Sequence, residues 1–337
     1  MKLRPISLAI LALFAFASCK QSTQTNTVTY SGIWNPISSP TIKFLEVGQF
    51  VNSSNGFVSG ANGTFLTTAD SGSTWIQRSP APVLYGGVTI YGISFFDAMT
   101  GFAAGDQREI SLTTDGGNTW NPMNTDNVPQ SDLIRSLYFT SRNSGLVGTS
   151  DAYGAASGSI CGSIDGGQTW NLVTSTAGGI YDINFNIPGS NGMKGVAVGR
   201  FGVSYWTVDG GGTWNAGTSD VPSSLIARTT FISATTGFAV STAINDNVHG
   251  NILQTNDGGH TWKTVYSVPQ GLTGIANNGY GTITAAGFGG VVIESTDVGT
   301  TWTQSNVGTN RWVDVRYANQ HRAVLFGENG NITARDK

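Results

Sequence analysis

Charged and reactive side chains are scarce in this chain of 337 residues. Asp, Glu, Lys and Arg make up 11% of it, against a typical ~25%, and there are only three His and two Cys residues. The formal net charge is -3, so the basic stripe expected of a nucleic-acid-binding protein is missing. Neither HExxH nor GxSxG occurs, so the sequence lacks the motifs of a zinc-dependent hydrolase or of a Ser-His-Asp triad enzyme. Aromatic residues reach 10%, and this argues against a disordered chain.

The two cysteines lie in different settings. Lys2 and Arg4 precede an apolar run from Ile6 to Ala17, which is too short to span a bilayer and predicts a secretory signal. The segment Phe16-Ala17-Ser18-Cys19 resembles the lipobox of bacterial lipoproteins. We therefore expect a signal peptide over residues 1–18, a lipidated Cys19, a polar tether over 19–29 and a folded domain over 30–337. The alternative is an ordinary signal peptide with an incidental Cys19.

This interpretation places the protein outside the cytoplasm, anchored to a membrane on the periplasmic side or at the cell surface. Cys161 then has no partner for an internal disulfide. Its apolar surroundings predict a buried structural thiol rather than a nucleophile, because no His lies near it in the sequence.

Tryptophan recurs with a period of about 45 residues, which is typical of repeat architectures. The repeating positions are Trp34, Trp75, Trp120, Trp170, Trp214, Trp262 and Trp302. Six of them end a motif of the form S/T-x-D-x-G-x-T-W, whose acids are Asp70, Asp115, Asp165, Asp209, Asp257 and Asp297. The motif resembles the Asp-box, or bacterial neuraminidase repeat, a hairpin turn in which Asp accepts backbone N–H groups and Gly supplies a positive φ. One acid per motif is too few for a Ca²⁺ loop, so we expect a structural role.

Each repeat also contains two further strand patterns upstream of the motif, and none contains a convincing helical stretch. Four short strands per repeat predict an all-β fold, a seven-bladed β-propeller of four-stranded antiparallel blades. The C-terminal segment from Trp312 supplies three strands, and the segment around Ile33 to Ser38 is expected to add the fourth and close the ring. WD40 blades would show Gly-His and Trp-Asp signatures, which are absent, and six blades would leave residues 312–337 without a role.

The face opposite the motif turns is where we expect a ligand, because loops on a rigid scaffold carry function. Two of the loops that join second and third strands are long, namely Thr149 to Ser159 and Ser241 to Asn251. The candidate binding residues on this face are Arg135, Arg228, Arg200, Tyr91, Tyr181, Trp312, Asp246 and His249. The structural alternative is that such side chains form ion pairs between blades and fill the channel.

One repeat, Gly101-Phe102-Ala103-Ala104-Gly105 followed by the segment Leu112 to Trp120, resembles the photosystem II stability/assembly factor family. The resemblance extends over residues 30 to 337. It implies a seven-bladed, non-enzymatic propeller that binds a protein partner through an arginine patch, although no arginine here aligns with that patch residue by residue. We accordingly expect a monomeric protein-binding scaffold with no catalytic residue, cofactor, metal or nucleic acid.

The competing hypothesis is a carbohydrate-active propeller, either a sialidase-like glycoside hydrolase or a glycan-binding protein. A sialidase would need three arginines, a Tyr activated by Glu and an Asp acid/base. The Arg-Ile-Pro segment typical of that family is missing. Glutamate is also sparse, occurring at Glu46, Glu109, Glu294 and Glu328.

Overall fold

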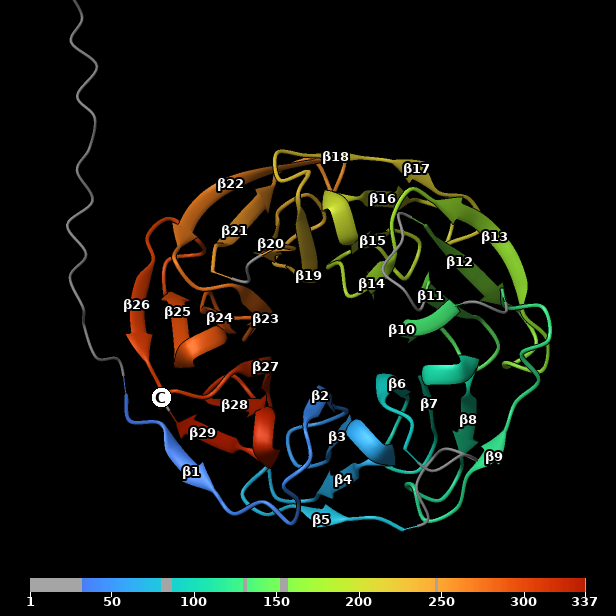
Figure 1. The fold of residues 1–337 in the computed structure, drawn as a ribbon, viewed down its shortest axis with the longest axis horizontal. Helices are drawn as coiled ribbons and strands as arrows, with labels where there is room; N and C mark the ends of the chain where they lie inside the picture. Colours follow the sequence, from blue (N-terminus) through green and yellow to red (C-terminus); the bar gives the residue numbers. More distant parts are fainter. Residues whose placement is uncertain (1–31, 80–86, 130–131, 152–156, 246–247, 337) are drawn as a thin grey trace, which may run out of the picture.

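A computed structural model of the protein describes residues 32–79, 87–129, 132–151, 157–245 and 248–336. Within these residues the strands form seven sheets, which are the blades of a ring (Figure 1). Two cavities lined by the inner strands form a channel along its centre. The predicted signal segment, Cys19 and the tether lie outside the described residues. In the described part of the chain, no helix has the length and apolar character needed to cross a bilayer.

The strands of each blade follow one another from the channel outward. Blade one contains β2 (Leu45–Phe50), β3 (Gly56–Gly60), β4 (Phe65–Thr68) and β5 (Ile76–Gln77). Blade two contains β6 (Ile90–Phe95), β7 (Gly101–Gly105), β8 (Ile110–Thr113) and β9 (Asn121–Pro122). Blade three contains β10 (Asp132–Phe139), β11 (Gly145–Asp151), β12 (Gly158–Ser163) and β13 (Asn171–Thr176). Blade four contains β14 (Ile180–Asn184), β15 (Gly195–Gly199), β16 (Ser204–Thr207) and β17 (Asn215–Ala216). Blade five contains β19 (Ser224–Phe231), β20 (Gly237–Ala243), β21 (Gly250–Thr255) and β22 (Thr261–Val268). Blade six contains β23 (Leu272–Asn277), β24 (Ile283–Gly287), β25 (Val291–Ser295) and β26 (Thr303–Asn306).

Blade seven joins the two ends of the described chain. Its inner strands are β27 (Trp312–Tyr317), β28 (Arg322–Gly327) and β29 (Ile332–Asp336), and its outer strand is β1 (Asn35–Ile37). Strand β1 pairs antiparallel with β29, and Pro36 lies opposite Thr333. The predicted seven-bladed ring, closed by the N-terminal strand, is therefore confirmed (Figure 1).

Two details differ from the predicted repeat. Blade five carries a fifth strand, β18 (Thr218–Ser219), which comes from the connection after blade four and pairs parallel with β22. In blade seven, Ile332 pairs with Phe326 as Val292 pairs with Ala286 in blade six. This register places Arg335, rather than a Ser or Thr, where the other blades begin the Asp motif.

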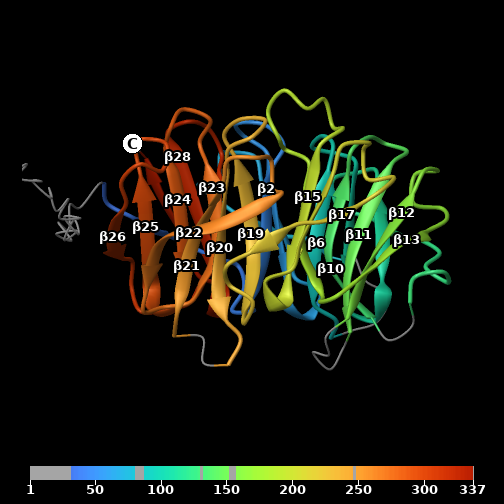
Figure 2. The same ribbon diagram turned by 90° about the horizontal axis from the view of Figure 1, so that it is seen from above.

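The strands run between two faces of the ring, which Figure 2 shows from the side. The Asp-motif turns and the connections between first and second strands lie on one face, called here the box face. The other, the loop face, carries the connections between second and third strands and those between blades. In five blades the second-to-third connection is a 3-10 turn: η1 (Ala61–Gly63), η2 (Asp106–Arg108), η3 (Arg200–Gly202), η4 (Phe288–Gly290) and η5 (Glu328–Gly330).

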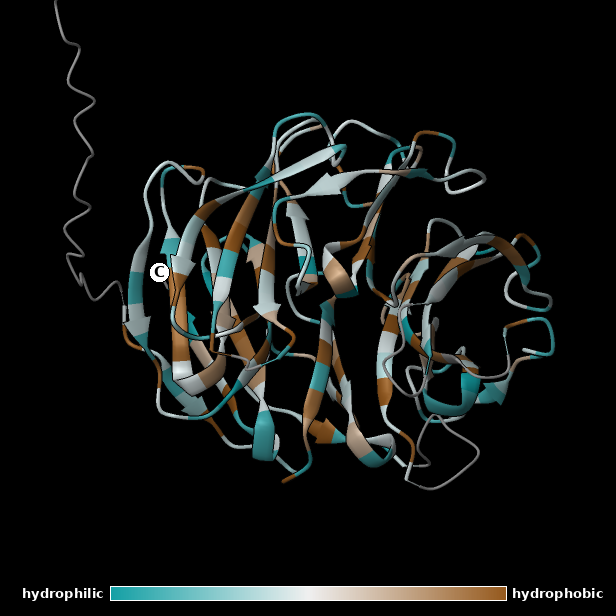
Figure 3. Cartoon of the chain, turned by 45° about the horizontal axis from the view of Figure 1, so that its top comes forward, coloured by the Kyte–Doolittle hydropathy of each residue, from teal (hydrophilic) through white to brown (hydrophobic). Residues whose placement is uncertain are grey.

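Aromatic side chains pack the space between neighbouring blades. Phe102 of blade two stacks on Phe139 of blade three with ring centroids 3.9 Å apart, and the edge of Trp170 meets Phe139 at 5.9 Å. Trp170 is fully buried, as is Cys161 in the same cluster. Apolar bands accordingly recur along the inner strands in Figure 3. Such aromatic pairs stabilise the contact beyond the area that they bury.

The Asp motif forms a hydrogen-bonded turn, seen in the second blade. Asp115 accepts hydrogen bonds from the backbone N–H groups of Asn118 and Thr119, at 3.0 and 2.8 Å, and from the Thr119 hydroxyl at 2.6 Å. The Thr113 hydroxyl donates to the same carboxylate and accepts from the N–H of Gly117. Gly117 has a φ of +86°, which an L side chain rarely adopts. Each residue type of the motif therefore has a local structural reason.

These turns predict a loss of stability in acid. Hydrogen bonds from Thr119 lower the pKa of Asp115 to about 2, and equivalent bonds from Thr169 and Thr213 do the same for Asp165 and Asp209. A carboxyl group whose folded pKa is depressed stabilises the fold fully above its ordinary pKa and loses this effect as the pH falls through the folded value. We expect the melting temperature to fall between about pH 4 and pH 2. Circular dichroism melts should show a shallower fall for the triple variant Asp115→Asn/Asp165→Asn/Asp209→Asn, and equal slopes would contradict the prediction.

Candidate ligand site at the channel mouth

Every inner strand carries a β-bulge near the loop face. The register shifts by one residue in each first-to-second strand pair, and the extra residues are Glu46, Tyr91, Arg135, Tyr181, Ala227, Thr273 and Val313. A bulge redirects the side chain of its extra residue. All seven line one cavity of about 250 Å³, together with Leu225, Arg228 and Arg311. We call this cavity the channel mouth.

The bulge residues on the two sides of the ring differ in chemistry. Glu46, Tyr91, Arg135 and Tyr181 come from four successive blades, whereas the other three blades supply Ala227, Thr273 and Val313. Small side chains on one side leave room beside the charged and aromatic ones. The bulge residues therefore form a polar, aromatic wall on one side of the mouth and a wall of small side chains on the other, and Leu225, Arg228 and Arg311 complete the lining.

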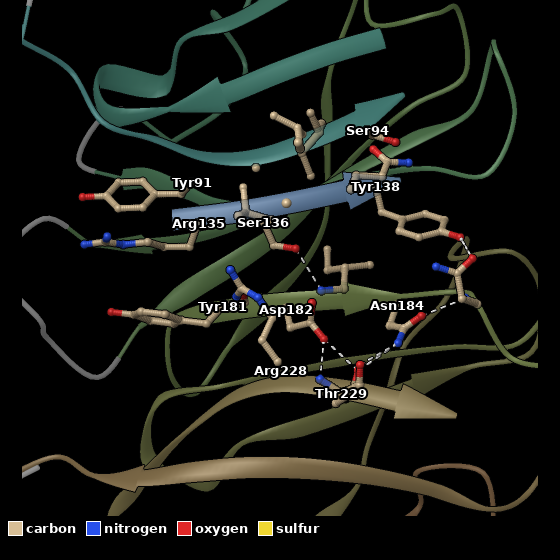
Figure 4. A pocket seen from close by; sticks show the side chains of 18 of the residues that line it. Tyr91, Ser94, Arg135, Ser136, Tyr138, Tyr181, Asp182, Asn184, Arg228 and Thr229 are labelled. Atoms are coloured by element: carbon tan, nitrogen blue, oxygen red, sulfur yellow. Dashed lines mark hydrogen bonds between the residues drawn. The ribbon is translucent and has the colours of Figure 1, made fainter. Parts of the chain in front are cut away.

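Arg135 forms the centre of the polar wall. Its guanidinium carbon lies 4.1 Å from the ring centroid of Tyr91 and 5.4 Å from that of Tyr181, and Figure 4 shows the three side chains as layers pointing the same way. Contacts of this kind hold a guanidinium by cation–π attraction. The Nε of Arg135 is buried and has no hydrogen-bond partner. Burial raises the pKa of Tyr91, partly offset by Arg135, so this phenol stays neutral at physiological pH.

Arg228 hydrogen-bonds to the main chain of the inner strands. Its Nη1 donates to the carbonyl oxygens of Tyr181 and Ala227, each at 3.0 Å. Beside it, the Asp182 carboxylate accepts from the N–H and the hydroxyl of Thr229 in the next blade, at 2.9 and 2.7 Å (Figure 4). Asp314 similarly accepts from the N–H of Gly48, which links the last blade to the first. These residues fix the inner strands relative to one another through hydrogen bonds, whereas the structural alternative had expected ion pairs between blades.

Two charged residues of the mouth were not among the predicted candidates. Burial raises the pKa of Glu46, and nearby Arg311, Arg228 and Arg135 oppose that shift. The guanidinium carbon of Arg311 lies 4.2 Å from the ring centroid of Phe288, and the Nε of Arg311 is buried without a hydrogen-bond partner. In the sequence, the signal for Glu46 was its place directly after Leu45, the first apolar residue of β2. No repeated pattern marks Arg311.

The remaining candidates are dispersed. Trp312 was wrongly predicted to face a ligand: it is 4% exposed, and its indole N–H donates to the Val307 carbonyl at 2.9 Å. His249 is exposed, and its carbonyl accepts from the N–H of Ala243 at 2.9 Å. Arg200 lines a smaller cavity that also includes Tyr181. Asp246 lies outside the described residues.

Carboxylates are few around the channel. A second cavity, of about 110 Å³, continues from the mouth along the channel and shares Tyr91, Arg135, Tyr181 and Arg228 with it. The described linings contain one carboxylate each, Glu46 at the mouth and Asp182 further in. Among the described residues, no cluster of three or more His, Cys, Asp or Glu side chains could hold a metal ion.

The sequence model of the DUF6242 beta propeller domain family matches residues 11–248, more than half of the chain. The chain belongs to this family. No curated protein sequence matches this member of the DUF6242 beta propeller domain family.

Solved structures share the fold of this DUF6242 propeller. "YCF48 bound to D1 peptide" is 20% identical with a TM-score of 0.71, covering 93% of this chain and 100% of that one. YCF48 from Cyanidioschyzon merolae is 19% identical with a TM-score of 0.69, covering 91% and 99%. The GH74 xyloglucanase from Xanthomonas campestris is 12% identical with a TM-score of 0.68, covering 91% of this chain and 54% of that one. At these identities the likeness establishes the propeller fold alone.

Proposed function

We propose that this protein is a non-catalytic, lipid-anchored extracytoplasmic propeller that binds a segment of a protein partner at the channel mouth, as an assembly scaffold. The observation that carries the proposal is Arg135, held between Tyr91 and Tyr181 with a buried Nε–H that has no acceptor. A buried donor without a partner costs about 1–3 kcal/mol. A ligand that brings an acceptor removes this cost when it binds.

The charge of the mouth specifies the kind of acceptor. Arg135, Arg228 and Arg311 line it against a single carboxylate, Glu46. A guanidinium binds carboxylates with strong, directional hydrogen bonds. The segment bound here therefore carries an acidic group, either an Asp or Glu side chain or a terminal carboxylate. The solved structure of YCF48 with a D1 peptide is a precedent for peptide binding on a propeller of this shape.

The path of the first strand is compatible with a lipid anchor. Strand β1 runs antiparallel to β29, so its N-terminal end lies toward the box face. An anchor at Cys19 precedes this end. The chain would then be tethered from the side opposite the channel mouth, leaving the mouth accessible to a partner away from the membrane.

The alternative function is carbohydrate binding or hydrolysis, which the fold shared with the GH74 xyloglucanase suggests. A glycosidase needs two carboxyl groups on either side of the scissile bond, about 5–9.5 Å apart. In the described linings, the mouth supplies only Glu46, and Asp182 is occupied by Thr229. Arg135 already covers one face of Tyr91 and one face of Tyr181, the aromatic rings at the mouth that could stack on a sugar. These observations favour the peptide-binding scaffold.

The variant Arg135→Gln tests the proposal. It removes the charged donor at the mouth, and we expect partner binding to weaken 10- to 100-fold, because hydrogen bonds to charged groups contribute about 1.5–3 kcal/mol. The measurement is quantitative affinity capture of the anchored protein from its own membranes, comparing each partner between variants. Arg78→Gln is the matched control, since Arg78 hydrogen-bonds Thr67 and Asn118 in the outer part of the ring. Identical partner recovery with Arg135→Gln would rule out the channel mouth.

A further inference from the structure

A side pocket adjoins the channel mouth between blades four and five. It has a volume of about 160 Å³ and is lined by Tyr181, Arg200, Leu225, Thr242, Ala243 and Ile244. Tyr181 and Leu225 also line the mouth, so the two cavities share a wall. A ligand in the mouth can therefore extend into the side pocket without crossing the scaffold.

The pocket exists because two neighbouring blades build their loop-face ends differently. Blade four turns at once through η3, which brings Arg200 to the rim. In blade five, β20 continues to Ala243, although the equivalent strand β7 ends at Gly105, the counterpart of Ser241. The extra residues Thr242 and Ala243 form the opposite wall. The pocket thus belongs to this pair of blades and not to the general repeat.

Two buried polar atoms in this lining lack partners. Thr242 is 5% exposed, and its Oγ1 has no hydrogen-bond partner; the Nε of Arg200 is likewise buried and unpaired. By contrast, the preceding Ser241 hydroxyl accepts a hydrogen bond from Asn251 at 3.2 Å. Buried polar groups are nearly always paired in native proteins, and unpaired ones indicate a missing partner. Both atoms can donate, so the missing partner is an acceptor.

The rest of the lining consists of Tyr181 and three apolar side chains. Leu225, Ala243 and Ile244 can contact an aliphatic group, and the volume is comparable to the ~150 Å³ cavities that hold a benzene-sized molecule. An acceptor next to an aliphatic body of this size is what one residue of a peptide presents. Its main-chain carbonyl can accept from Arg200 and Thr242 while its side chain fills the pocket.

We propose that the side pocket is a specificity subsite for an aliphatic residue, Val, Leu or Ile, that lies one or two positions from the acidic group bound at Arg135. The inference rests on the proposed peptide-binding function and adds the identity of the neighbouring residue. The carbonyl of that residue accepts from the Nε–H of Arg200 and the hydroxyl of Thr242. The partner is therefore recognised by a short acidic-aliphatic motif.

The test is selection of a displayed library of random octapeptides on the full chain. With the wild-type protein we expect at least 10-fold enrichment of Asp, Glu or a free C-terminus, with Val, Leu or Ile one or two positions away. Ala243→Phe fills the pocket, so the aliphatic preference should disappear while the acidic preference remains. The control Ala216→Phe, at an exposed position of β17, should leave both preferences unchanged.

The outcomes separate the subsite from the proposed function. Acidic enrichment with random neighbours, or an aliphatic preference that persists in Ala243→Phe, would overturn the subsite and leave the peptide-binding function standing. No acidic enrichment, or enrichment unaffected by Arg135→Gln, would overturn both. Thr242→Val, which keeps the shape of the side chain, guards against misfolding of the Phe variant. It should weaken a selected peptide about 10-fold, and unchanged affinity would count against the subsite.

Discussion

Replacing Glu294 with Ala is expected to lower the free energy of unfolding by about 3–5 kcal/mol, the usual cost of leaving a buried charge unpaired. Arg335 and Glu294 are 1% and 4% exposed, and both terminal nitrogens of the guanidinium donate to the carboxylate. Thr284 donates to the same carboxylate at 3.1 Å. The pair joins β29 of the closing blade to β25 of the blade before it. Without Glu294, the charge of Arg335 stays in the interior but loses the carboxylate that both of its terminal nitrogens contact.

Urea denaturation of three variants gives the measurement and its controls. The double variant Glu294→Leu/Arg335→Met should lie close to wild type, because apolar replacements of a buried pair are often neutral. Asp336→Ala removes the partner of Arg322 in the same blade, but Asp336 is 65% exposed and the expected cost is below about 1 kcal/mol. If Glu294→Ala costs no more than Asp336→Ala, the pair does not stabilise ring closure.

The scaffold could be predicted from the sequence because its signals repeat. The Asp motif occurs six times, and each copy has the same local cause, so errors in one repeat are corrected by the others. Ring closure could be predicted from two incomplete repeats. The segment at Trp34 matches only the end of a repeat, and the segment from Trp312 matches only its beginning, so together they make one blade. A single copy of either pattern would have predicted neither blade number nor closure.

The site could be predicted only in part, because one residue of offset decides where an inner-strand side chain points. Tyr91, Arg135 and Tyr181 occupy bulge positions and line the mouth. Trp312 precedes its bulge by one residue and is buried in the core, although it looked equally suitable in the sequence. Bulges leave little trace in composition, since no side-chain type is common to the seven bulge residues: two are Tyr and the other five all differ.

The unpartnered polar atoms are harder still to predict. Thr242 and Ser241 are adjacent hydroxyl residues in one strand, yet only Ser241 finds a partner. Which of them does depends on the length of β20 and on what the neighbouring blade places opposite. That information is tertiary, so no local pattern could have identified the side pocket.

Deletion of residues 30–38 is expected to cost roughly 4 kcal/mol or more, because it removes the strand that closes the ring and the large aromatic side chain of Trp34. The Trp34 ring centroid lies 4.7 Å from the guanidinium carbon of Arg335, and Ile37 packs against the cluster that contains Phe326. Without this segment, β29 becomes an open edge and the Arg335–Glu294 pair meets water. The melting temperature should fall accordingly.

Adding the missing strand back as a separate peptide distinguishes ring closure from general damage. A synthetic peptide of residues 30–38 should raise the melting temperature of the truncated protein in a concentration-dependent way, since it binds only the folded ring. The same peptide carrying Trp34→Ala should have little effect, because it keeps the three backbone pairs of β1 but loses the cover over Arg335. Equal rescue by both peptides would show that backbone pairing alone closes the ring. A truncated protein that melts like wild type would show that six blades and an open seventh are stable without closure.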